Sequence, residues 1–173
     1  TLIFPFLTMG CSGTGSNDQK TKTITVIDGY LHNAIICIDR NKNSNCEVIE
    51  ELALKTNELG HIQVNLADAQ YPIIAKAQAG STYDSDQLTP LTKSYELIAP
   101  ADSDYITPYT TLAFLNNISL QSLAEQFDFN YVAISNDYVK DKQDEPQLAH
   151  LIARAITPMI DSEILNNNIS ELN

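Results

Sequence analysis

The sequence predicts a mainly β protein in which a β-sandwich is followed by a small helical extension. Short segments rich in β-branched residues recur between turn residues as far as Pro100, which is typical of sandwiches. Beyond Pro100, helix-capping residues precede segments in which apolar side chains have helical spacing. A hydrophobic content of 43% in 173 residues is enough for a real core.

Five strands are expected in the first part of the chain. Residues 23–27 alternate and are β-branched, and the Asp28-Gly29 turn follows them. The polar segment 80–93 is expected to connect the last two strands. The expected strands cover residues 23–27, 34–38, 61–66, 71–79 and 94–99.

Three helices are expected after Pro100. Thr107 caps the first, over residues 109–115, with Pro108 at its first position, and Ser119 begins the second, over 120–127. The third covers residues 147–160, and residues 144–146 open it. Pro158 is expected to kink or end it. The apolar stripe expected on this helix is Leu148, Leu151, Ile152, Ala155, Ile156 and Met159.

These changes of character divide the chain into four parts. Residues 1–22 are expected to be a signal remnant and a flexible linker, and residues 23–100 the sandwich. Residues 101–165 would form the helical extension, and residues 166–173 a linker.

Residues 39–50 have the spacing of a calcium loop. Calcium prefers roughly six to eight oxygen ligands, which a loop of this length supplies from alternating positions and a final bidentate carboxylate. Glu50 would close the shell, Asn45 would offer its backbone carbonyl, and Glu47 would bind directly or through water. The predicted cofactor is Ca²⁺, and the predicted ligands are Asp39, Asn41, Asn43, Asn45, Glu47 and Glu50.

Ser44 stands at the loop position where helix-loop-helix calcium sites carry glycine. Either Ser44 adopts a costly positive φ, or the loop curls differently. The alternative interpretation of the segment is a polar, asparagine-rich turn between two elements.

Two cysteines bracket this loop. Cys37 lies near the end of the incoming strand and Cys46 lies inside the loop, so a disulfide would hold the ends of the site together. Closing such a loop is worth about 2–3 kcal/mol in the chain-entropy account. The alternative is a buried free Cys37 with an unrelated Cys46, as in a reducing compartment.

The third cysteine, Cys11, follows an almost wholly apolar segment and precedes a polar one. This pattern resembles the end of a bacterial lipoprotein signal peptide, in which the cysteine after Gly10 is acylated. It departs from that pattern because Leu7 lies four residues before Cys11 and Thr8 takes the usual place of leucine. An ordinary cleaved signal or a buried apolar strand is the alternative, and the segment is about half as long as a membrane span.

The chain is acidic, with a formal net charge of −12. Nucleic acids and anionic lipid surfaces attract basic proteins, so neither is expected as an electrostatic partner. Any membrane contact is therefore expected through the N-terminal lipid.

Other candidate chemistry is sparse. Asp84 and Asp86 could form a second cation site or a ligand surface, or lie in a solvated hairpin loop. The chain has no zinc-spaced histidine pair, nucleophile elbow or phosphate loop. A glycan-binding surface, with core or rim packing as the alternative, is considered for Tyr30, Tyr71, Tyr95, Tyr105 and Tyr109.

A family resemblance rests on residues 26–34, 37–43, 56–60 and 106–112, together with Cys46 and Pro100. These resemble segments of uncharacterised surface lipoproteins of Gram-negative marine bacteria. The first half is also similar to carboxypeptidase-regulatory, transthyretin-like and Cna-B-type sandwiches, and the acidic loop is similar to calcium loops in B repeats of bacterial adhesins. In such loops aspartate is commoner at the position of Glu47.

The resemblance implies a calcium-stiffened stalk or binding domain at the cell surface. We therefore expect a non-enzymatic, lipid-anchored module of the outer membrane or cell surface, which binds an unknown surface protein or glycan. A periplasmic or secreted location is the alternative. The rival function is a secreted or periplasmic carboxylate-based hydrolase, in which the sandwich is accessory. Converging carboxylates between the two parts of the chain would favour that rival.

Overall fold

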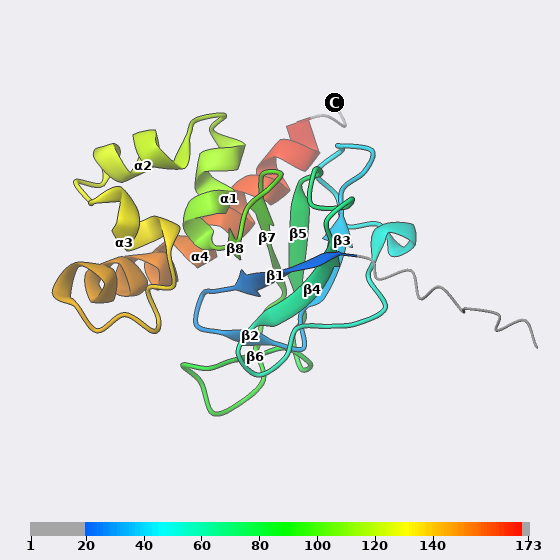
Figure 1. The fold of residues 1–173 in the computed structure, drawn as a ribbon, viewed down its shortest axis with the longest axis horizontal. Helices are drawn as coiled ribbons and strands as arrows, with labels where there is room; N and C mark the ends of the chain where they lie inside the picture. Colours follow the sequence, from blue (N-terminus) through cyan, green and yellow to red (C-terminus); the bar gives the residue numbers. More distant parts are fainter. Residues whose placement is uncertain (1–19, 171–173) are drawn as a thin grey trace, which may run out of the picture.

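Strands occupy the first part of the chain and helices the last, so the fold is mixed α/β (Figure 1). The structure is a computed structural model that describes residues 20–170, with side chains as far as residue 160. The strands are β1 Thr21–Val26, β2 Leu31–His32, β3 Ile35–Ile38, β4 His61–Asn65, β5 Ile73–Ala77, β6 Tyr83–Asp84, β7 Tyr95–Ala99 and β8 Tyr105–Ile106.

The strands form three small sheets, with the orders β4-β1-β8, β2-β6 and β3-β5-β7. The five expected strands correspond to β1, β3, β4, β5 and β7. The two-residue strands β2, β6 and β8 were not predicted, because so short a segment shows no alternation. β1 pairs antiparallel with β4 and parallel with β8, where Thr25 lies opposite Tyr105.

The helices are α1 Pro108–Leu115, α2 Leu120–Gln126, α3 Tyr131–Ser135 and α4 Asp144–Ser170. Both predicted caps are confirmed. Thr107 accepts from the backbone N–H of Thr110, whose hydroxyl accepts in return from Thr107 N, and Ser119 caps α2. The short helix α3 was not predicted.

The last helix differs from the prediction in its end and in its buried face. α4 continues through Pro158 to Ser170, so Pro158 does not end it, and residues 166–170 belong to the helix. Of the predicted stripe, Ile156 is buried and Ile152 packs partly against the core, whereas Leu148, Leu151 and Met159 are 49%, 67% and 65% exposed. The face that enters the core is lined by Ala149, Ala153, Ile156 and Ile160. Small alanines permit the close approach of α4, which a stripe of leucines would have prevented.

A single hydrophobic cluster contains side chains from strands and helices together. Ile24 and Val26 of β1 and Leu97 of β7 belong to it, as do Tyr109 of α1 and Tyr138 of the segment before α4. The Tyr109 ring makes edge-to-face contacts with Phe127, Phe129 and Tyr138. The helices are therefore packed on the strands through one core.

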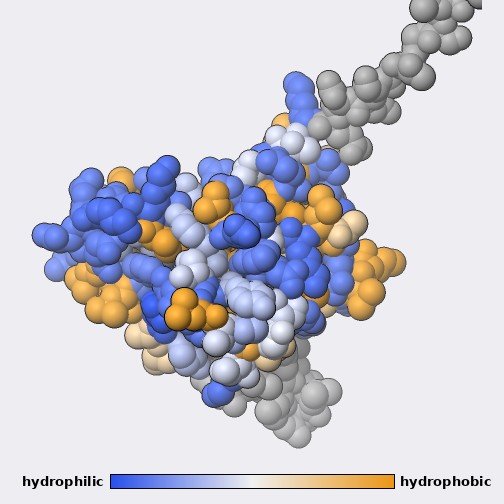
Figure 2. Space-filling model, turned by 90° about the horizontal axis from the view of Figure 1, so that it is seen from below, coloured by the Kyte–Doolittle hydropathy of each residue, from blue (hydrophilic) through white to orange (hydrophobic). Residues whose placement is uncertain are grey.

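A smaller cluster lies on sheet β3-β5-β7 and contains Ile35, Cys37, Ile74 and Ile98, with Phe114 of α1 packed against it. On the face seen in Figure 2, hydrophilic residues predominate and hydrophobic ones lie in separate groups. This distribution fits the acidic, polar composition of the chain.

Candidate functional site

The predicted calcium loop leaves the end of β3 and returns through a single 3-10 turn, η1 Val48–Glu50. Asp39 follows β3 directly and is fully buried, and its backbone N–H donates to Pro72 O at 3.0 Å. Glu50 ends η1 and is only 5% exposed. The first and last predicted ligands are thus held by two separate elements.

The carboxylate of Asp39 shapes the first half of the loop. Its two oxygens accept from the backbone N–H groups of Asn43 and Ser44, both at 3.0 Å. Asn41 Oδ1 also accepts from Asn43 N, at 3.0 Å, and Asn43 Oδ1 accepts from Asn45 N at 2.9 Å. These hydrogen bonds from backbone amides to side-chain oxygens fold the segment into a curl.

Ser44 makes the sharp turn at the position where glycine is usual. Its φ is 59°, in the left-handed region, and Lys42 has the same φ. The first of the two expected solutions is therefore the one adopted. The strain of two non-glycine residues in this region is offset by the amide hydrogen bonds to Asp39.

Glu50 closes the loop upon its own beginning. Its Oε1 accepts from Arg40 N at 2.9 Å and from Asn41 N at 3.4 Å. Its Oε2 is buried and has no hydrogen-bond partner among the described residues. A buried carboxylate oxygen without a donor lowers the stability of the folded state, because it has lost its hydrogen bonds to water and forms none with the protein.

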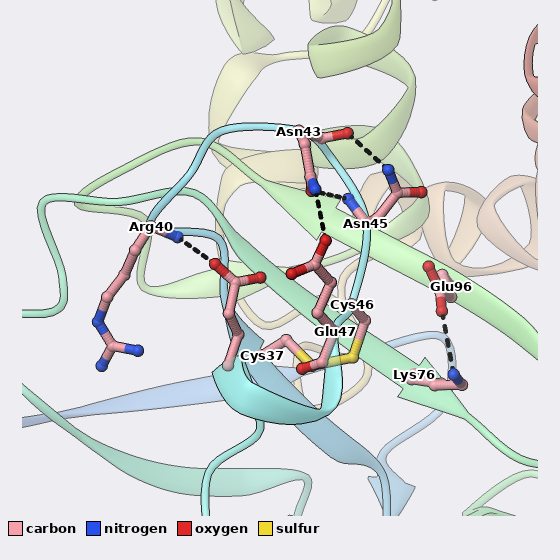
Figure 3. The surroundings of a disulfide bond; sticks show 9 residues. Cys37, Arg40, Asn43, Asn45, Cys46, Glu47, Lys76 and Glu96 are labelled. Carbon is pink, nitrogen blue, oxygen red and sulfur yellow. Dashed lines mark hydrogen bonds and ion pairs between the residues drawn. A yellow bond between two sulfur atoms is a disulfide. The ribbon is translucent and has the colours of Figure 1, made fainter.

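The remaining predicted ligands lie on the exposed rim of the loop. Figure 3 shows Asn43 and Glu47 turned toward each other, and Asn43 Nδ2 donates to Glu47 Oε1 at 2.8 Å. Asn45 Nδ2 donates to the carbonyl of Asn43 at 3.0 Å, and Asn41 is exposed like its neighbours. The structure thus brings the predicted ligands into one loop, with Asp39 and Glu50 inside and the others at its edge.

The predicted disulfide between Cys37 and Cys46 is present, with the Cα atoms 5.4 Å apart (Figure 3). It joins β3 to the middle of the loop and packs on sheet β3-β5-β7. The alternative of two unrelated free thiols is thereby excluded in this structure. Among the described His, Cys and acidic side chains, Cys37, Cys46 and Glu51 form a group whose three ligand atoms lie within 4.8 Å of one another. The two cysteine sulfurs of this group, however, are already bonded in the disulfide.

A second acidic site, which the sequence did not reveal as one unit, lies between the strands and α4. Asp28, in the turn after β1, and Asp84, on β6, are 6% and 3% exposed. They line a cavity of about 190 Å³ together with Tyr95 and with Arg154 and Thr157 of α4. Asp84 is thus not part of a solvated hairpin loop. No sequence motif relates residue 28 to residue 157, so their proximity is visible only in the folded structure.

The two aspartates of this cavity have altered acidity. The pKa of Asp28 is raised to about 6. Burial is the main cause and the charge of Asp84 adds to it, while the hydrogen bonds from Tyr95 and Thr157 lower the pKa. Burial also raises the pKa of Asp84, and the charge of Asp86 adds to that effect. Asp86 itself lies 2.8 Å from His150 Nε2 and 3.0 Å from Arg154.

A larger cavity, of about 740 Å³, lies between the β7–β8 connection, α1 and α3. Tyr105 is the one member of the considered tyrosine set that lines it, and Tyr131 lies there as well. Tyr109 is fully buried, and its hydroxyl donates to Ala149 O at 2.7 Å. Tyr95 donates to Asp28, so Tyr95 and Tyr109 have packing roles instead of a shared surface role.

The predicted lipidation site Cys11 lies outside the described residues. Among the helices described, none is long and apolar enough to cross a bilayer. No protein-family model matches the chain, no curated protein is similar to it in sequence, and no solved structure matches its fold. The two acidic sites are therefore the features of the structure that bear on function.

Proposed function

We propose that the protein is a non-enzymatic module of the bacterial cell surface, anchored by a lipid on Cys11 and stabilised by Ca²⁺ in the 39–50 loop. The observation that carries the proposal is the buried, unpartnered Oε2 of Glu50, at the end of the loop that the fully buried Asp39 begins. A calcium ion would supply the positive partner that this oxygen lacks, and the oxygen-rich loop matches the ligands that calcium prefers.

The ligand shell would be completed at the rim. Asp39, Asn41, Asn43 and the carbonyl of Asn45 would bind from one side of the ion and Glu50 from the other. Glu47 is exposed and bonded to Asn43, so calcium would compete with that hydrogen bond and draw the carboxylate inward. The Cys37–Cys46 disulfide limits how far the loop can open, which favours a structural over a signalling role for the ion.

The sandwich kinship expected from the sequence remains part of this proposal. In such a module, ligand capture would use the 740 Å³ cavity, whose lining combines Tyr105 and Tyr131 with Asp104 and Asn117. Aromatic faces beside hydroxyl, amide and carboxylate groups are suited to a glycan or to a segment of a surface protein.

Thermal unfolding of the full chain in calcium and in chelator tests the metal. At a hundredfold excess over Kd, calcium should stabilise the wild type by about 2.7 kcal/mol, or about 5–10 °C in Tm. Glu50→Gln should abolish that response, whereas Glu58→Gln, an exposed position with the same charge change, should keep it. A wild-type Tm indifferent to calcium would remove the metal from the proposal.

Labelling tests the anchor separately. The full-length precursor expressed with a labelled fatty acid should carry the label, and Cys11→Ser should lose it. An unlabelled wild-type product would remove the anchor and leave the calcium site untouched.

The hydrolase remains the second candidate because two buried carboxylates meet a cavity between the strands and α4. Both oxygens of Asp28 accept hydroxyl hydrogen bonds, however, which leaves them poorly placed to attack or protonate a substrate. Release of p-nitrophenol from chromogenic glycosides, lost in Asp84→Asn, would support the hydrolase. Equal release by both proteins would count against it.

A further inference from the structure

The cavity beside Asp28 and Asp84 contains an electrostatic imbalance. Both residues are more than nine-tenths buried, and no lysine, arginine or histidine in the described part of the chain forms an ion pair with either. Buried charges in proteins are normally paired or neutralised, because the loss of hydration is otherwise uncompensated. Two unpaired carboxylates beside one cavity therefore need an explanation.

Arg154, which lines the cavity, already forms an ion pair with Asp86, and Lys93, which also lines it, is exposed and forms no ion pair with either of the two buried aspartates. His150 Nε2 and an Arg154 nitrogen lie 2.8 and 3.0 Å from the same Asp86 oxygen. Arg154 lines the cavity and attracts Asp28 and Asp84 only from a distance. The cavity is thus lined by two buried aspartates that have no ion-paired cation among the described residues, while Arg154 pairs with Asp86.

The backbone holds Asp84 firmly in this position. Asp84 lies on β6, which pairs with β2, and its Oδ1 accepts from Asp86 N at 2.9 Å. Gly29 passes so close that a Cβ there would lie 2.0 Å from Asp84 Oδ1. The absence of a side chain at residue 29 is therefore what makes room for a carboxylate beside Asp28.

We infer that this cavity binds a small molecule with a primary ammonium group, of about the size of an amino acid, whose ammonium lies against Asp84 and Asp28. The ammonium would supply the missing countercharge and donate hydrogen bonds to Asp84, whereas Asp28, whose oxygens already accept from Tyr95 and Thr157, would attract it by charge. Arg154 and Lys93, which line the cavity, would face the ligand's other end, so a carboxylate there is favoured over a second ammonium.

Size and ligand geometry favour an organic cation over a metal ion. A volume of about 190 Å³ holds about six water-sized groups, which is far more than one ion needs and less than a drug-sized ligand fills. Asp28, Asp84 and Asp86 do not form one of the tight three-ligand groups found among the described residues. Tyr95 and Thr157 already donate to both Asp28 oxygens, which a metal ion would have to displace.

The test uses three probes that share a two-carbon unit: ethylamine carries only the ammonium, propionate only the carboxylate, and L-alanine both. Each is titrated into the full chain at pH 7 in calcium-containing buffer while the backbone amides of Gly29 and Asp84 are followed by NMR. Ethylamine and alanine should shift these amides saturably, with alanine the tighter of the two, and propionate should not.

Variants locate the binding. Asp84→Asn should weaken both ammonium probes at least tenfold, and the charge-matched Glu58→Gln should leave their Kd within twofold of the wild type. Thr92→Trp, at an exposed residue of the cavity wall, should block the mouth and weaken binding even if Asp84→Asn does not fold. Propionate binding as strong as that of ethylamine, no saturable shift with any probe, or unchanged binding in the folded variants would overturn the inference. Because calcium is present throughout, none of these outcomes bears on the 39–50 loop.

Discussion

The Tyr95 hydroxyl on β7 donates a 2.8 Å hydrogen bond to Asp28 Oδ2. Thr157 of α4 donates to the other oxygen of Asp28 at 3.0 Å. One carboxylate after β1 thus links a strand and the last helix. Its protonation state should therefore be visible in the stability of the whole fold.

Asp28→Asn is expected to remove the loss of folding stability that ionisation of the buried Asp28 carboxyl causes as the pH rises. The pKa of Asp28 is about 6 in the folded protein and 3.8 as its ordinary value, so the folded state binds the proton more tightly. Stability from this group is present below about pH 4 and is lost as the pH rises through 6. The stability of the variant relative to the wild type should therefore increase by about 2 kcal/mol from pH 4 to pH 7. Urea unfolding of both proteins at several pH values measures this difference, and parallel curves would contradict it.

Gly29→Ala is expected to destabilise the fold by about 1–3 kcal/mol, because the new methyl group collides with the Asp84 carboxylate. The cost should shrink when Asp84 is also replaced by alanine, since the colliding oxygen is then gone. A double-mutant cycle by urea unfolding measures this coupling. Equal costs in the two backgrounds would show that Gly29 is needed for some other reason.

Loss of the disulfide in Cys37→Ala/Cys46→Ala should cost about 2–3 kcal/mol, since the bridge closes a short loop with a sequence separation of 9. Chemical denaturation in chelator isolates this effect from any bound metal. The same variant should bind calcium more weakly, because the unpinned loop must be ordered on binding. Peptide mapping without reductant provides the direct check: free thiols at both wild-type cysteines would contradict the bridge.

Tyr109→Phe should destabilise the protein by about 1 kcal/mol, because the hydroxyl bond to the carbonyl of Ala149 joins α1 to α4 inside the core. Tyr131→Phe is the matched control, since Tyr131 is 42% exposed. Thermal or urea unfolding measures the stability of both variants. An equal loss of stability in the two would mean that the buried Tyr109–Ala149 hydrogen bond does not stabilise the fold more than the exposed hydroxyl does.

The sequence was informative where one short segment carries the whole signal. Thr107 and Ser119 were recognised as caps because capping depends on residues three positions apart. The Cys37–Cys46 bridge was recognised because one cysteine precedes the loop and the other lies within it. The curl of residues 39–50 followed from the alternation of Asp and Asn.

The sequence was silent where the structure depends on distant partners. The strands β2, β6 and β8 exist only because other strands lie beside them. The stripe on α4 was right only at Ile152 and Ile156, because helical spacing cannot tell which of two neighbouring apolar faces has room against α1 and the sheets. Ala149 and Ala153 were overlooked because alanine contributes little to a hydrophobic pattern. Their small side chains nevertheless determine how closely α4 packs against the core. The Asp28–Asp84 cavity draws on four separate segments, and no pattern within one of them predicts it.

The parallel pairing of β1 with β8 has a consequence for how the chain reaches its native state. Thr25 and Val26 must wait for Tyr105 and Ile106, about eighty residues later, before their sheet is complete. Thr157 arrives later still to cover Asp28. Contacts of such long sequence separation slow folding, because the intervening chain must be ordered first. A ribosome-bound chain that ends before residue 106 would thus expose β1 as an open edge, and the native fold should form only after synthesis has passed α4.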